Sequence, residues 1–553
     1  MSSYALIDDR SNIEIVSSIL TSFLSNSSEI ASLDVSKKSE LVSALLSDLD
    51  ENGVQLKWND DVRLLALQTL KTLGRNVNGC ELLFSDKGFL ILLSHASLLS
   101  NDVVVDTPVA QEALTCIANA LLLEEDTRDL FEKHNCISKI CLGLKDVKIS
   151  IKTQFLYSRI LFLVTIKTSP IVKQLIDDLK IIDILHNTIN NLVKEISSST
   201  IVEPSPSPIT RVTLLNEQLK FLFNLMHYDP KIVREEGKGK NQELPSKFEK
   251  LLPIIIKIIT ELPPPSPLPL SPPHSHAIHA LLNFPVTPYK SIWFPPEQKT
   301  QQYALLNKFL ETLKTMIFIA VNGDPDVGIE NGQQKYGVNF DEVIPPLVAL
   351  IRKLAEEDEL ARINAKNILL PDDPYIYIIN LGCYFENNID NFSLEILSDR
   401  SKPLEKGDDL SARLIRLMTS AMLPNLKDGV SELLYVICDQ DVNLFIHHVG
   451  YGNAAGFLMN RNIMVPPLTS SSKQKVHSDK SINPITGQYL ENEAPSLSDM
   501  TDEEKEREAE RLFVLFERLK KTGVMNVVNP VEEAAKSGKI NEIIDDEEKE
   551  ESD

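Results

Sequence analysis

The chain has 553 residues, of which 43% are hydrophobic and 6% are aromatic, and its formal net charge is −23 at pH 7. This charge disfavours nonspecific binding to nucleic acid or to an anionic membrane surface. Leucine and isoleucine recur without the alternation that is typical of half-buried strands, so we expect an all-α protein. No uninterrupted apolar run reaches the roughly 18 residues of a membrane span, and no signal peptide is evident, which predicts a soluble cytoplasmic protein without an integral membrane segment.

Five apolar helical segments share one pattern, because each carries a polar residue near its middle. These residues are Arg75, Asn119, Arg159, Asn224 and Asn283. The first two steps span 44 and 40 residues, close to the period of about 40–47 residues in armadillo and HEAT repeats.

The later steps are longer because they contain insertions. Proline-dense segments cannot continue a helix, so we assign them to loops. The insertions lie at about residues 197–210, 234–246 and 263–274. We therefore predict an armadillo/HEAT-like superhelix over residues 1–465.

In such an array, polar residues that recur on the inner helices can bind the backbone of an extended or helical partner in the concave groove. This hypothesis makes the five polar residues candidates for partner contacts. The alternative is that each side chain satisfies a carbonyl group of a neighbouring loop, as polar residues within helices often do. The sequence alone leaves both open.

The sequence becomes polar beyond residue 465, and we predict a flexible linker over residues 466–500. Thr501 and Glu504 have the spacing of a capping box, which predicts a helix over residues 501–523. One face of this helix is apolar and includes Leu512, Phe513 and Phe516. We expect this face to bind a partner, and packing against the chain's own superhelix is the alternative. The acidic tail at residues 524–553 is expected to be disordered.

A cluster of glycines, Gly450, Gly452 and Gly456, lies where the helical patterns end. Its letters match the dinucleotide fingerprint G-x-G-x-x-G/A, which suggests a nucleotide-dependent enzyme as one hypothesis. A nucleotide site of that kind needs a strand directly before the glycines. The helical surroundings instead favour a tight structural turn between helices.

Other patterns associated with catalysis or metal binding are incomplete. His274, His276 and His279 have the spacing H-x-H-x-x-H, but no neighbouring Cys or carboxylate completes a metal site, so we expect them to begin a helix. The six cysteines have no C-x-x-C spacing, and they are expected to be reduced core residues. No G-x-S-x-G, Walker lysine or H-E-x-x-H motif occurs. We expect no cofactor, no metal and no covalent catalysis.

Three blocks of sequence resemble one known family. They are V-S-E-L-L-Y-V-I-C-D-Q-D-V-N-L-F-I-H-H-V-G-Y-G-N-A-A-G-F-L (430–458), S-I-N-P-I-T-G (481–487) and M-T-D-E-E-K-E-R-E-A-E-R-L (500–512). Their order and spacing are similar to those of synembryn, the resistance-to-inhibitors-of-cholinesterase family. The segments L-K-T-L-G-R-N, F-L-Y-S-R-I-L-F-L, L-K-F-L-F-N and H-A-L-L-N-F-P-V also resemble its repeat helices.

The resemblance implies a cytosolic exchange factor and chaperone for heterotrimeric G protein α subunits. It implies that the concave groove binds the C-terminal helix of the GDP-bound α subunit, free of βγ, and stabilises the nucleotide-free state. Groove contacts then fall on the five polar residues, and the helix at residues 501–523 is a second contact. An armadillo-type peptide-binding scaffold without exchange activity is the alternative. The sequence does not predict an oligomeric state.

Overall fold

The computed structural model describes most of the first 463 residues and two positions beyond them. The described residues are 4, 9–26, 33–50, 58–99, 104–167, 170–198, 208–235, 246–296, 301–321, 323–326, 333, 335–371, 402–463, 501 and 507. Contacts divide the chain into two units, residues 1–399 with 404–467, and residues 400–403 with 468–553. All helices described below belong to the first unit.

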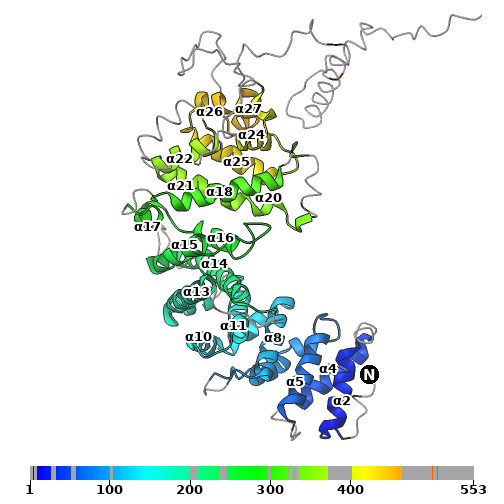
Figure 1. Ribbon diagram of the computed structural model, residues 1–553. Coiled ribbons are helices and arrows are strands. Elements are labelled where there is room, and N and C mark those ends of the chain that lie inside the picture. The colour runs from blue at the N-terminus through cyan, green and yellow to red at the C-terminus, as the bar shows by residue number, and fades with distance from the viewer. Residues whose placement is uncertain are drawn as a thin grey trace, which may run out of the picture. The chain divides into compact units, whose positions relative to one another are not determined.

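Eight helices form a series in which each one packs against the next, and we call them the ladder helices. Figure 1 shows them following one another in chain order from blue to yellow. They are α2 (Ile13–Ser25), α5 (Asp60–Leu73), α8 (Pro108–Leu123), α11 (Ile151–Val164), α14 (Arg211–Glu235), α16 (His274–Leu281), α21 (Pro345–Glu357) and α25 (Pro424–Ile437).

The other helices pack between or beside the ladder helices. They are α4 (Val35–Leu49), α6 (Glu81–Phe84), α7 (Asp86–His95), α9 (Asp126–Lys133), α10 (Ile137–Lys145), α12 (Pro170–Lys173), η1 (Gln174–Asp178), α13 (Ile181–Ser197), η2 (Ser246–Leu251), α15 (Leu252–Glu261), η3 (Thr287–Tyr289), α17 (Lys290–Trp293), α18 (Ala304–Ala320), α20 (Phe340–Val343), α22 (Glu359–Leu369), η5 (Leu404–Lys406), α24 (Leu410–Leu417), α26 (Val442–Val449) and α27 (Tyr451–Asn460). Every element bounded in the described ranges is helical, which confirms the all-α prediction. A ladder of packed helices is also what an armadillo/HEAT-like array requires.

Short polar side chains fix where many helices begin. The first amides of a helix have no partner within it, so an oxygen from the preceding residue stabilises them. The residues whose side chains accept such a bond include Asn12, Asp34, Asn59, Ser85, Thr107, Ser150, Asp358, Asp409 and Asp441. Proline at the start of α8, α21 and α25 adds a preset backbone angle where no amide donor is needed.

Cations from neighbouring helices stabilise the ends of two ladder helices. Lys38 of α4 is 8% exposed, and its Nζ donates to two carbonyl oxygens of the loop after α5, at 2.6 and 2.7 Å. Lys353 of α21 donates in the same way to two carbonyl oxygens just beyond α16, at 2.8 and 2.7 Å. A cation is favourable at this end of a helix because the free carbonyl groups carry partial negative charge. These contacts fix the backbone of both loops.

The apolar sides of the helices form one core along the first unit. Phe221 of α14, Phe309 of α18 and Trp293 of α17 are among the largest fully buried side chains. The described cysteines are also buried and form no disulfide with one another, whereas Cys383 lies outside the described residues. Among the described segments, no helix combines the length and apolar character needed to cross a membrane.

Candidate functional site

Charged side chains of α11 and α14 meet at one buried carboxylate. Glu217 of α14 is 4% exposed, and its Oε1 accepts from Nη1 of Arg159 on α11 at 3.2 Å. The same oxygen accepts from Nζ of Lys220, one turn further along α14, at 2.6 Å. A buried carboxylate is unfavourable unless cations neutralise it. Here two cations share one carboxylate, so the cluster carries a net positive charge to the surface.

Aromatic side chains lie next to these cations. The Nζ of Lys220 is 5.6 Å from the ring centre of Phe162 on α11. Phe223 of α14 is 37% exposed, stacks on His227 at 5.8 Å and lies 6.2 Å from the ring of His279 on α16. We call the surface formed by Arg159, Phe162, Lys220, Phe223, His227 and His279 the α11–α14–α16 face.

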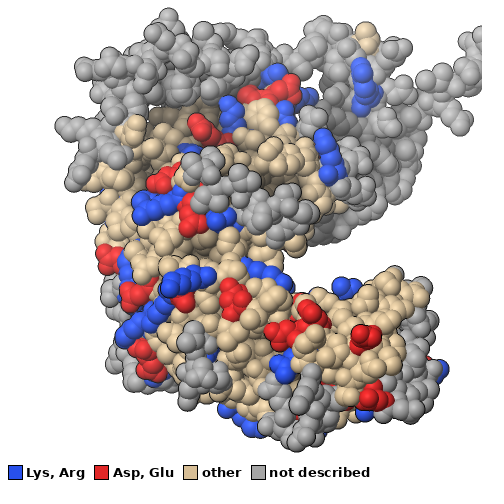
Figure 2. Space-filling model, turned by 60° about the horizontal axis from the view of Figure 1, so that its bottom comes forward, with Lys and Arg blue, Asp and Glu red and all other residues tan. Residues whose placement is uncertain are grey.

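The α11–α14–α16 face has the chemistry of a binding surface for protein. Aromatic rings supply contact area at low entropic cost, and a partner's acidic group or carbonyl oxygen can accept from the guanidinium and ammonium groups. Figure 2 shows basic and acidic side chains interspersed over one side of the molecule, with no large area of a single sign. That mixture suits a specific protein partner better than a polyanion.

Asn119 of α8 is half-buried and lies beside exposed apolar side chains at the end of its helix. Leu122 is 49% exposed and Leu123 is 42% exposed. These two leucines add apolar area to the surface next to Asn119. Asn119 therefore stays a candidate for a partner contact.

The side chain of Asn224 satisfies polar groups of a neighbouring segment, which is the alternative to a partner contact. Its side chain is buried, with 8% exposure, and its Nδ2 donates to the carbonyl oxygen of Phe162 at 3.1 Å and to Oγ1 of Thr165 at 3.3 Å. These bonds satisfy polar groups at the end of α11. Asn224 thus positions α14 against α11, and its contact with a partner stays a prediction.

Arg75 and Asn283 do not lie within helices, contrary to the prediction. Helix α5 ends at Leu73 and Gly74 caps it, so Arg75 is exposed in the following loop. Helix α16 ends at Leu281, and Asn283 donates from Nδ2 to the carbonyl oxygen of His279 at 3.0 Å. Arg75 keeps a side chain accessible to a partner, whereas Asn283 satisfies the last turn of its own helix.

Sequence reasoning missed the residues that join the ladder helices electrostatically. Glu112 of α8, which is 5% exposed, forms an ion pair with Lys71 of α5. The contact of Glu217 with Arg159 repeats this pair two helices further along the ladder. One local signal was present, because Glu112 and Glu217 are carboxylates within largely apolar helical patterns.

His274 is the first residue of α16 and His276 follows it, as the sequence predicted, whereas His279 lies in the last turn of this helix. Burial, with a contribution from Lys308, lowers the pKa of His274 to about 4. Burial also lowers the pKa of His276 to about 4, with contributions from Lys220 and His279. Within the described part of the chain, no group of three His, Cys, Asp or Glu side chains is placed to hold a metal ion.

The glycine cluster divides between a turn and a helix. Gly450 has φ of 79° and joins α26 to α27, where a residue with a β-carbon would be strained. Gly452 and Gly456 instead lie within α27 on its exposed side, which corrects their assignment to the turn. The element before Gly450 is a helix, so the strand that a dinucleotide site requires is not there.

Substituting Gly456 with alanine is expected to stabilise the protein by about 0.5–1 kcal/mol, because alanine is the better helix former and a β-carbon there meets no atom within 4 Å. The matched control is Gly88→Ala in α7, where the β-carbon would lie 2.2 Å from the carbonyl oxygen of Leu82. That variant is expected to lose about 1–3 kcal/mol. Urea titrations of both variants measure the changes, and a destabilised Gly456→Ala variant would show an unrecognised contact at α27.

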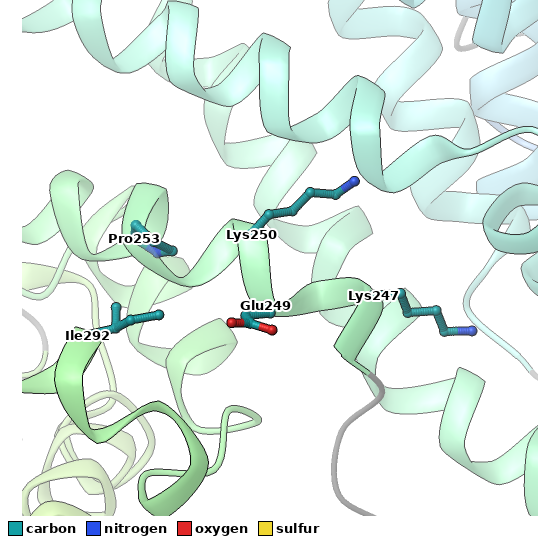
Figure 3. A pocket seen from close by; sticks show the side chains of 5 residues that line it. All are labelled: Lys247, Glu249, Lys250, Pro253 and Ile292. Carbon is teal, nitrogen blue, oxygen red and sulfur yellow. The ribbon is translucent and has the colours of Figure 1, made fainter.

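A shallow pocket of about 340 Å³ lies between η2, α15 and α17. Figure 3 shows Lys247 and Lys250 extending away from Pro253 and Ile292. Lys247 contacts Asp229 at 2.8 Å, and Lys250 forms an ion pair with Asp183. Both cations are thus neutralised by the protein itself, so the pocket is not an anion site.

The predicted apolar face of the C-terminal helix lies outside the described residues. Leu512, Phe513 and Phe516 belong to this part, as do the whole predicted linker and the whole acidic tail. The role of this helix in partner binding stays a prediction.

The helix ladder and the α11–α14–α16 face together define a helical-array protein with a surface suited to a protein partner. A family model described as guanine nucleotide exchange factor synembryn matches residues 66–374 and 392–539. The chain belongs to the synembryn family.

Comparisons with individual proteins agree with this assignment. The chain is 26% identical over 487 residues to "Chaperone Ric-8A" of Macaca fascicularis, covering 84% of this chain and 82% of that protein. It is 33% identical over 156 residues to a synembryn-like chaperone of Schizosaccharomyces pombe, covering 26% of this chain and 29% of the relative. An engineered protein of known structure matches 84% of this chain with a TM-score of 0.41 and 14% identity, which is too low to support an argument about the fold.

Proposed function

We propose that this chain is a guanine nucleotide exchange factor and folding chaperone for heterotrimeric G protein α subunits. The observation that carries the proposal is the match to the exchange-factor family over residues 66–374 and 392–539. Relatives that are named chaperones support the second activity. The chain acts in the cytoplasm in this proposal, on α subunits that are free of βγ.

The C-terminal helix of the GDP-bound α subunit docks on the α11–α14–α16 face, with Arg75 and Asn119 as further contacts. The half-exposed cations and aromatic rings of the face support this placement, because they match the acidic groups, free carbonyl oxygens and apolar side of such a helix. Apolar residues of the predicted helix at 501–523, including Leu512, Phe513 and Phe516, brace the opened α subunit as a second contact.

Exchange in this proposal needs no covalent chemistry by the chain. A partner that binds the nucleotide-free α subunit more tightly than the GDP-bound form lowers the affinity for GDP by the same factor. GDP then dissociates, and the complex persists until GTP binds. The same preference for an open, incompletely closed α subunit gives the chaperone activity a physical basis.

The purified chain is expected to lower the affinity of a purified α subunit for GDP by about 5–150-fold, the usual range of coupling between two ligands. Release of a fluorescent GDP analogue, followed with and without the chain, measures the effect. A stable complex with the nucleotide-free α subunit is expected in gel filtration. Unchanged release without such a complex would contradict the proposal, and binding without faster release would favour the peptide-binding scaffold instead.

A further inference from the structure

Glu217 lies beneath the α11–α14–α16 face and contacts both of its cations. Its side chain is 5% exposed, whereas the side chains of Arg159 and Lys220 are each 30% exposed. Both cations bind the same atom, Oε1, at 3.2 and 2.6 Å. The two positive groups are therefore held side by side from two different helices, with their remaining N–H groups unbound by the described residues.

The two oxygens of the Glu217 carboxylate differ in their contacts. Glu217 Oε2 is buried and has no hydrogen-bond partner in the described part of the chain, although an unsatisfied buried acceptor costs stability. Both cations lie on the other oxygen, Oε1, which holds them together at the surface.

Long cationic side chains lose considerable conformational freedom when they bind a partner. A side chain that is already held in place loses less, so its contact with a partner contributes more to affinity. Glu112 holds Lys71 in the same manner between α5 and α8. A buried carboxylate that holds exposed cations thus occurs at two places along the ladder.

We propose that Glu217 is a positioning residue for partner binding, which holds Arg159 and Lys220 as a paired donor for an acidic group or a helix-end carbonyl oxygen of the partner. This inference rests on the proposed function. Removing the carboxylate frees two like charges to move apart, so the partner must order them again when it binds. The loss in affinity should therefore depend on the presence of both cations.

The test is a mutant cycle in the full chain, with a fluorescent peptide of the C-terminal helix of a G protein α subunit as the probe. Glu217→Gln is expected to weaken peptide binding about tenfold, the size of one charge-assisted hydrogen bond. In an Arg159→Gln/Lys220→Gln background, the same substitution is expected to change binding less than about twofold, because a positioning residue acts only through the residues it positions.

Each outcome of the mutant cycle either supports or overturns the role of Glu217 as a positioning residue. Equal losses in both backgrounds would show a general structural role, and unchanged or tighter binding by Glu217→Gln would also overturn the inference. Thermal melts check that every variant is folded. If Glu217→Gln does not fold, Glu217→Asp keeps the charge but shortens the side chain, and the same pattern across the two backgrounds is expected. Failure of the wild-type chain to bind the peptide would instead overturn the docking proposal itself, and this inference with it.

Discussion

Replacing Phe221 with alanine is expected to destabilise the protein by about 3–5 kcal/mol, the usual cost of removing a buried phenylalanine ring. Phe221 is fully buried on the side of α14 that faces the core. The neighbouring helices are already close-packed, so they relax only in part and leave a cavity. Chemical denaturation followed by circular dichroism measures the change, and a loss below about 1 kcal/mol would contradict this account of the core.

Phe223 provides a matched control on the same helix. This ring is 37% exposed and contacts His227 and His279 at the surface. Phe223→Ala is expected to cost less than about 1 kcal/mol in stability. If the α11–α14–α16 face binds the partner, the same variant should weaken peptide affinity by about 1–2 kcal/mol, as exposed aromatic contact residues often do. The two substitutions should thus separate folding from binding.

Acidification from pH 7 to pH 4 is expected to destabilise the protein through His274 and His276. Burial holds the pKa of each ring at about 4, below the ordinary value of 6.5. The unfolded chain therefore binds more protons than the folded chain between these two values, and stability falls as pH falls. The stabilising contribution of each neutral ring is fully present above about pH 6.5, and the loss of stability is expected to reach about 2–3 kcal/mol per ring at pH 4.

Glutamine at both positions removes the two titrations. The free energy of unfolding of a His274→Gln/His276→Gln variant should therefore decline less than that of the wild type over this range, as urea titrations at successive pH values would show. The difference between the two proteins should be constant above pH 7, because neither ring then binds a proton. Parallel pH profiles down to pH 4 would contradict the depressed pKa values.

Helices were the most predictable part of the structure, because their signals are local. Ser150 and Thr107 precede apolar periodic segments and cap the helices that follow. His274 and His276 begin α16 directly after a proline run. The ends of helices were less predictable. Arg75 was placed within a helix because the apolar pattern continues past it, whereas the structure ends α5 one residue before Gly74.

The candidate site was predictable only in part, because its contacts join residues that are far apart in sequence. Glu217 and Arg159 are separated by 58 positions, and no local pattern links them. Asn224 and Phe223 are neighbours, yet one is buried against α11 and the other is exposed. The buried and exposed sides of a helix depend on its neighbours in the fold. A polar residue within a helix could therefore not be assigned to either side from the sequence alone. Arg159 was identified because it belonged to a repeating series.

The backbone contacts of Lys38 and Lys353 affect how the loops at Arg75 and Asn283 can change by mutation. The two lysines bind carbonyl oxygens of these loops, and the contacts do not involve the side chain at either position. If Arg75 contacts the partner, as we propose, a new side chain at position 75 would start from the same backbone position as the arginine. Single substitutions there could then change which partner is preferred, without a change in the loop that carries them.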